Sequence, residues 1–149
     1  MIKIDDIKAM AYTLGACNKV ESINSIADAV GLLLTPQGRE FALKTGFPSI
    51  ELWRTTANHI LLPDCVFLDE DKRGVDESDV VIVGESSVSI VADKPIKLYH
   101  IIAMHGAEVE INASNYAVVT VTSINATVRI TNDGTAKVTV EQSGKGGSQ

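Results

Sequence analysis

The sequence is poor in aromatic residues and cysteine. Aromatic side chains make up only 5% of the 149 residues, although 45% of the residues are hydrophobic. The interior must therefore be filled mainly by Val, Ile, Leu and Ala, whose thin side chains suit narrow, stacked β-structure. The two cysteines, Cys17 and Cys65, lie far apart and beside apolar residues. Their spacing is not that of a zinc site, and we expect buried thiols.

The sequence also has no long run of one charge and no long hydrophobic run. Its net charge is −6, with acidic and basic residues spread along the chain. It therefore lacks the basic patch that nucleic-acid binding needs, and no nucleic-acid partner is expected. The residues that follow Met1 do not form a signal peptide, and no apolar run is long enough to span a bilayer. We expect synthesis in the cytoplasm, without a cleaved signal or a membrane partner.

Residues 1–60 predict a module of short helices. Apolar residues recur there at helical spacing, and residues that favour helix ends separate the apolar stretches. Threonine followed by proline at positions 35 and 36 is a strong helix-start signal. The expected N-caps are Asp5, Ser22, Thr35 and Ser49, with left-handed stops at Gly15 and Gly46. Helices this short need tertiary packing to be stable.

Residues 61–142 predict short strands, because the apolar period changes to two. We expect early strands at residues 65–68, 80–83, 88–91 and 96–103, with Asp69–Asp76 as an exposed loop. An Ala-x-Val-x-Ile/Val unit then recurs about every ten residues, beginning at Ala107, Ala117, Ala126 and Ala136. Alternate residues of a strand share a face, so the Ala, Val and Ile residues point inward. The intervening positions are polar, apart from Val118.

Two arrangements fit this repeat. In a β-solenoid, resembling a right-handed β-helix, equivalent strands stack and Asn residues occupy the corners. In an antiparallel meander, turns such as Asn132–Gly134 form hairpins. The solenoid is favoured because the other turns are less hairpin-like. The predicted fold class is thus α+β, a short helical module followed by a short β-solenoid, with residues 143–149 as a flexible tail.

Motifs for catalysis or metal binding are missing. The chain has no nucleophile elbow, phosphate-binding loop or dinucleotide fingerprint. His100 and His105 fall on opposite faces of a strand unless the chain turns between them, and Asp69–Asp71 lacks calcium-site spacing. Glu108 and Glu110 share an outward face, which leaves an unfamiliar hydrolase or lyase site as an alternative. The expectation is a protein that is not an enzyme and has no cofactor and no metal.

Several segments resemble small proteins encoded by bacteriophages and prophages of gut Bacteroidetes bacteria. These segments are Thr35–Phe41, Gly46–Trp53, His100–Ala107 and Ala113–Val119. The Ala-x-Val-x-Ile/Val repeat is also similar to the β-helical repeats of phage-encoded proteins. This resemblance implies a structural or accessory protein of a phage or mobile element, with the virion as a candidate location, and it supplies no catalytic residues.

The expected function is self-association or docking onto a larger assembly. An open solenoid end exposes strand edges, which another subunit or the tail must cover. A homo-oligomer is therefore expected, and other virion proteins are further candidate partners. The alternative is a solenoid face that binds a carbohydrate or a host protein through exposed aromatic residues. The candidate interface residues are Trp53, Tyr99, Tyr116 and Val118. Trp53 has a second interpretation, as a core residue packed with Phe41 and Phe47.

Overall fold

The chain divides into two compact units between Asp64 and Cys65, close to the boundary predicted at residues 60 and 61. A computed structural model describes residues 4–13, 15, 21, 23–95 and 97–142. The predicted cap Ser22, the thiol of Cys17 and the predicted tail 143–149 lie outside the described residues. The first unit is helical and the second is built from parallel strands, which confirms the predicted α+β class.

The first unit contains α1 (Ile4–Thr13), α2 (Ile26–Leu33), α3 (Pro36–Thr45) and α4 (Ile50–Ala57). The caps at Thr35 and Ser49 are confirmed, since their hydroxyls accept hydrogen bonds from the backbone N–H groups of Gly38 and Leu52. Gly46 ends α3 with φ of 76°.

Two predicted caps are wrong. α2 begins at Ile26, and its cap is Ser25, whose hydroxyl accepts a hydrogen bond from the N–H of Asp28. The Asp28 carboxylate in turn accepts from the N–H of Asn24, so two donors near the start of the helix are satisfied there. Asp5 lies within the first turn of α1, where its charge favours the helix N-terminus, rather than capping it.

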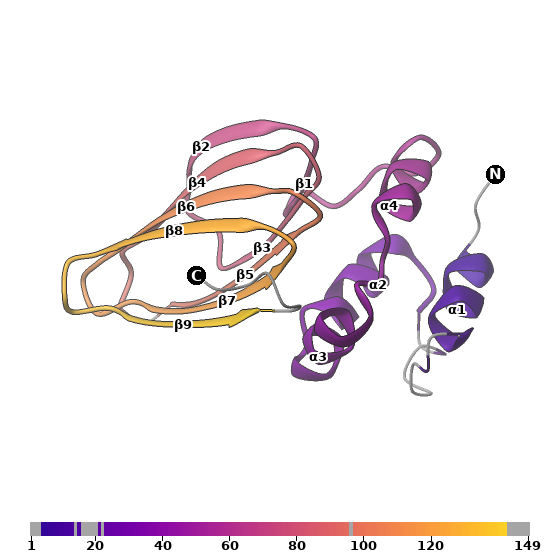
Figure 1. Ribbon diagram of the computed structural model, residues 1–149, viewed down its shortest axis with the longest axis horizontal. Helices are drawn as coiled ribbons and strands as arrows, with labels where there is room; N and C mark the ends of the chain where they lie inside the picture. The colour runs from indigo at the N-terminus through magenta and orange to yellow at the C-terminus, as the bar shows by residue number, and fades with distance from the viewer. Residues whose placement is uncertain (1–3, 14, 16–20, 22, 96, 143–149) are drawn as a thin grey trace. The chain divides into compact units, whose positions relative to one another are not determined.

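The second unit is a β-solenoid, because successive strands alternate between two parallel sheets (Figure 1). The five-stranded sheet has the order β1-β3-β5-β7-β9 and the four-stranded sheet the order β2-β4-β6-β8. All neighbouring strands are parallel, which excludes the antiparallel meander. The strands are β1 (Val66–Leu68), β2 (Asp71–Val75), β3 (Asp79–Val83), β4 (Ser87–Ala92), β5 (Leu98–Met104), β6 (Glu108–Ala113), β7 (Val118–Ile124), β8 (Thr127–Asn132) and β9 (Lys137–Gln142).

The repeat places equivalent side chains above one another in the solenoid interior. Val109 pairs in register with Val128, and Ile111 pairs with Ile130. On the other sheet, Val119 pairs with Val138 and Val121 with Val140. The first member of each pair is at most 1% exposed. The inward Ala-x-Val-x-Ile/Val ladder predicted from the sequence is therefore confirmed, and it forms the core between the two sheets.

Left-handed residues form the corners. Asn115 and Asn125 have φ of 55°, as expected for Asn at solenoid corners, and His105 has φ of 58°. His105 and Gly106 form the turn that the sequence allowed between His100 and the next strand. Gly134 has φ of 99° but joins β8 to β9 across the two sheets, so Asn132–Gly134 is a solenoid corner and not a hairpin.

One expectation for the strands is wrong, and the outer faces of the two sheets differ. Asp69–Asp76 is not simply a loop, since Asp71–Val75 forms β2 and pairs with β4. An edge strand whose side chains are exposed needs no apolar alternation, so the periodicity gave no signal. The outward positions of the four-stranded sheet are polar apart from Val91, but part of the outer face of the five-stranded sheet is apolar in the strands that precede the Ala-x-Val-x-Ile/Val units. Outward residues Val81, Val83, Ile102 and Met104 there are all 0% exposed.

Candidate functional site

The last turn of the solenoid, formed by β8 and β9, is the place where the interior ladder ends uncovered. Ile130 is 37% exposed and Val140 is 38% exposed, whereas their partners one turn earlier, Ile111 and Val121, are 0% exposed. Ala126, Val128, Ala136 and Val138 are only partly buried against the core. Full burial of a Val or Ile side chain is worth roughly 1.5 to 3 kcal/mol. A covering layer over this turn would therefore be stabilising.

Among the described residues, the same turn presents backbone groups that have no partner strand. The N–H of Lys137 donates to the carbonyl of Ala117 at 2.9 Å, and the N–H of Thr127 donates to that of Ala107 at 2.9 Å. Backbone groups of successive strand residues point to opposite sides within the sheet plane. The N–H and C=O groups of Val128, Ile130, Val138 and Val140 therefore face away from the stack, where they are available to another strand.

The first turn, in contrast, is protected against strand pairing. Lys72 occupies the ladder position that Val88, Val109 and Val128 occupy on later turns. The register of β2 shifts between Lys72 and Val75, and β1 contains only 3 residues. A short edge strand, a bulge and a charge at an inward position are the features by which natural sheets prevent edge-to-edge association. In the described structure, only the last turn lacks all three.

Two of the four candidate interface residues are accessible. Tyr116 is 67% exposed at a corner, where its N–H bonds to the hydroxyl of Thr135. Val118 lies on the outer face of β7, partly exposed, between its register partners Leu98 and Lys137. Leu98 is 60% exposed. Leu98, Tyr116 and Val118 are here called the corner patch; the sequence analysis did not single out Leu98.

Tyr99 is not an exposed recognition residue, because its side chain is 0% exposed. It occupies an inward position of β5, and its hydroxyl donates to Asp76 Oδ1 at 3.0 Å. Asp76 also accepts from Lys94 Nζ at 2.9 Å. The hydrogen bond from Lys94, followed by the one from Tyr99, holds the pKa of Asp76 below its usual value. The pKa of Tyr99 is raised, mainly because the side chain is buried and secondly because its hydroxyl is hydrogen-bonded to Asp76. This cluster anchors a solenoid corner.

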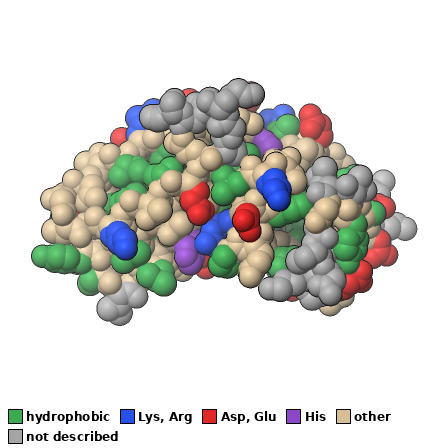
Figure 2. Space-filling view, turned by 60° about the horizontal axis from the view of Figure 1, so that its bottom comes forward, with side chains coloured by type: hydrophobic (Ala, Val, Ile, Leu, Met, Phe, Trp, Pro, Cys, Tyr) green, Lys and Arg blue, Asp and Glu red, His purple; other side chains and the backbone are tan. Residues whose placement is uncertain are grey.

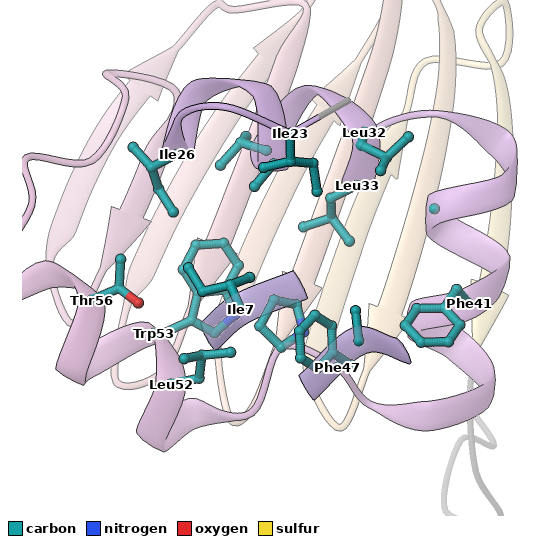
Figure 3. Close-up of a pocket in the computed structure, with 15 residues that line it drawn as sticks. Ile7, Ile23, Ile26, Leu32, Leu33, Phe41, Phe47, Leu52, Trp53 and Thr56 are labelled. Carbon is teal, nitrogen blue, oxygen red and sulfur yellow. The ribbon is translucent and has the colours of Figure 1, made fainter. Parts of the chain in front are cut away.

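Trp53 is likewise not an exposed anchor, since it is 4% exposed. Its second interpretation is confirmed: it lines a cavity of about 90 Å³ inside the helical unit, together with Phe41 and Phe47 (Figure 3). Side chains from all four helices surround this cavity, and nearly all of them are apolar. Sites for drug-sized ligands usually enclose roughly 300 Å³ or more. The cavity therefore fits a packing space better than a substrate pocket.

The polar side chains do not converge on a reactive centre in the part of the chain that the structure describes. His100 Nδ1 lies 3.2 Å from Asp79 Oδ1 on the outer face of the five-stranded sheet. Glu108 and Glu110 lie on the outer face of β6, where Glu110 is in register with Ser89 and Arg129. No group of three or more His, Cys, Asp or Glu side chains among the described residues is placed to hold a metal ion.

Charged side chains of both signs are scattered over the face shown in Figure 2, without a continuous basic patch. None of the described helices has the length and apolar character needed to cross a bilayer.

Comparisons with protein families, with curated proteins and with solved structures find no match to this chain. The resemblance to phage-encoded proteins and the predicted function therefore stay predictions, and the open end of the solenoid is identified by its geometry alone.

Proposed function

We propose that this chain is a non-enzymatic structural protein that acts by self-association through the last turn of its solenoid. The supporting observation is the difference between the two ends of the stack. Lys72 and a bulge protect the first turn, whereas Val128 stands at the equivalent position of the last turn with a free strand edge. A monomeric protein would gain from protecting both ends.

The resemblance noted in the sequence supports a more specific proposal, that the protein is a component of a phage or prophage particle. Self-association through strand edges is a means of building such an assembly. The gene neighbourhood tests this class directly. Adjacent capsid, portal or tail genes are the expected result, and a neighbourhood of unrelated metabolic genes would contradict it.

The alternative proposal is a module that binds a host protein or a carbohydrate. The exposed corner patch of Leu98, Tyr116 and Val118 favours it. Against it, binding of sugars along a solenoid face calls for aromatic residues aligned across turns, and Tyr99 is buried.

Self-association is tested with the variant Val128→Lys, which gives the last turn the residue that the first turn has at this ladder position. Thr127→Lys is the matched control, because it adds the same charge to the outer face of the same strand. Light scattering after gel filtration should give a mass of at least twice 15.9 kDa for the unmodified chain and the control, and 15.9 kDa for Val128→Lys.

A third variant, Leu98→Glu, distinguishes the two surfaces. If Leu98→Glu dissociates the protein and Val128→Lys does not, the corner patch is the interface and the proposal is wrong. A protein of 15.9 kDa at every concentration would also overturn it. Circular dichroism spectra and melting curves show whether each variant is folded.

A further inference from the structure

The exposed edge of β9 has a charge pattern that is complementary to itself in the antiparallel direction. Its outward residues are Lys137, Thr139 and Glu141, and its free-edge backbone groups belong to Val138 and Val140. When a second copy of β9 is turned end for end about Thr139, Lys137 faces Glu141 of the second copy and Glu141 faces its Lys137. Val138 of each copy then lies opposite Val140 of the other copy.

We propose that two copies of this chain join end to end across a two-fold axis, with β9 pairing antiparallel to β9 of the second copy in the register centred on Thr139. This inference rests on the proposed self-association and assigns its symmetry and register. The occupant of the open end is thus a second copy of the chain, and the assembly closes as a dimer because the interface is the same surface on both copies.

The backbone supports this register independently of the charges. Val138 and Val140 present the free N–H and C=O groups, and the register places them opposite each other, so each pair exchanges two hydrogen bonds. Lys137, Thr139 and Glu141 then fall at non-hydrogen-bonded positions, where opposite side chains are closest. The inward side chains stay inward, so Val138 and Val140 extend the apolar interior into the second copy.

Other registers of the same pairing are disfavoured. Centring on Lys137 or on Glu141 places like charges opposite each other, which is destabilising. Centring on Val138 places Lys137 opposite Thr139, and centring on Val140 places Glu141 opposite Thr139, so neither register pairs Lys137 with Glu141. Glu141 is already held over the outer face, because its carboxylate accepts a hydrogen bond from the hydroxyl of Thr122 at 3.3 Å.

The four-stranded sheet allows the same axis. The free-edge groups of β8 belong to Val128 and Ile130, which alternate with outward residues as in β9. A two-fold axis that crosses both strands pairs β8 with β8 of the second copy. Centred on Ile130, this pairing places Arg129 opposite Thr131, so no like charges meet. Both edges of the last turn are then covered at once.

Parallel stacking of the last turn on the first turn of another copy is the competing arrangement, and it would build fibres. It is disfavoured because Lys72 would be placed over the apolar ladder at Val128. The ammonium group of Lys72 would then lose contact with water beside apolar side chains, without an opposite charge to compensate it.

A disulfide tests the register. The central pair, Thr139 and its copy, has an expected Cα separation of about 4.5 Å, within the range that a disulfide spans. In a background of Cys17→Ser and Cys65→Ser, Thr139→Cys should form a covalent dimer under mild oxidation. Thr120→Cys is the matched control: it lies on the same outer face one strand inward, in register with residue 139, and should stay monomeric on a non-reducing gel.

Charge reversal gives a second readout. Lys137→Glu and Glu141→Lys should each raise the dimer dissociation constant about tenfold, since each disrupts two symmetric pairs. The double variant exchanges the charges and should restore dimerisation. A dimer that forms no Thr139→Cys link, or that the single and double variants affect equally, would overturn the register while leaving self-association intact.

A strictly monomeric chain would contradict the proposed function itself. Monomers that become dimers once residues 143–149 are deleted would show that this segment covers the edge, which would also overturn the inference.

Discussion

At the residue scale, the closest approach in the helical unit occurs at Gly38. A Cβ atom at this position would lie 2.8 Å from the Cα of Leu33 and closer still to the carbonyl oxygen of Leu32. These are backbone atoms of α2 and the residue is in α3, so the two helices can touch only because Gly38 has no side chain. The predicted role of Thr35 as a cap gave no indication of this contact, because packing between helices does not appear in the local pattern.

Gly38→Ala is therefore expected to destabilise the helical unit by about 1 to 3 kcal/mol, the usual cost of overpacking, although alanine is the better helix former. Gly31→Ala in α2 is the matched control, since no atom lies within 4 Å of a Cβ atom there. The control should be neutral or stabilise by about 0.5 to 1 kcal/mol. Urea unfolding measures both, and equal effects would contradict the close approach.

The corner at Asp76 predicts a dependence of stability on pH. The pKa of Asp76 is lowered in the folded protein, by Lys94 first and then by Tyr99. Because the pKa is lower in the folded state, the carboxylate stabilises the protein at pH values above its unfolded pKa of about 3.9. This contribution is lost as the pH falls through the pKa of the folded state. Asp76→Asn should be less stable at neutral pH, with a smaller loss of stability in acid.

The measurement is the urea midpoint of both proteins from neutral pH to pH 2. The two curves should converge as the pH falls below 4. Parallel curves would show that the Asp76 carboxylate has no special interaction in the folded state.

At the element scale, the sequence predicted strands wherever one face repeats an apolar pattern. The units predicted to begin at Ala107 and Ala117 do form strands with a buried face, because burial in the interior requires period-two alternation. β2 was missed because its stability comes from backbone pairing with β4, which needs no apolar side chains. The buried outward residues of β3 and β5 were missed for a similar reason, since a local pattern gives no information on what covers a sheet.

The stack also predicts different costs for the same substitution at different turns. Ile111 and Ile130 are register partners, but Ile111 is 0% exposed and Ile130 is 37% exposed. Ile111→Ala should cost about 2 to 5 kcal/mol of unfolding free energy. Ile130→Ala should cost much less in dilute solution, where no second copy covers it. Urea unfolding at low protein concentration makes the comparison, and equal costs would show that the last turn is covered within one chain.

The candidate site was only partly predictable from the sequence. An open solenoid end was expected from the repeat alone, and Val118 was correctly placed on the outer face. Tyr99 was misplaced because its inward position in β5 precedes the first Ala-x-Val-x-Ile/Val unit. The asymmetry of the two ends depends on Lys72, whose place in the ladder becomes visible only in the register of β2 with β4.

At the scale of the whole molecule, the account is that of a stack with one protected end and one end available for pairing. Growth onto the first turn is opposed by charge and irregular geometry, so the proposed association is limited to the last turn. A symmetric dimer satisfies both free edges of that turn and leaves none for further growth. This limit distinguishes a closed assembly from a fibre.

Amide hydrogen exchange at the edge of β9 tests the central claim most directly. The N–H groups of Val138 and Val140 have no partner strand among the described residues, so their exchange reports whether the open end is covered. At high protein concentration, we expect both amides to exchange as slowly as those of β7, and to lose this protection on dilution and in Val128→Lys. Rapid exchange at every concentration would contradict the claim that the last turn is an interface.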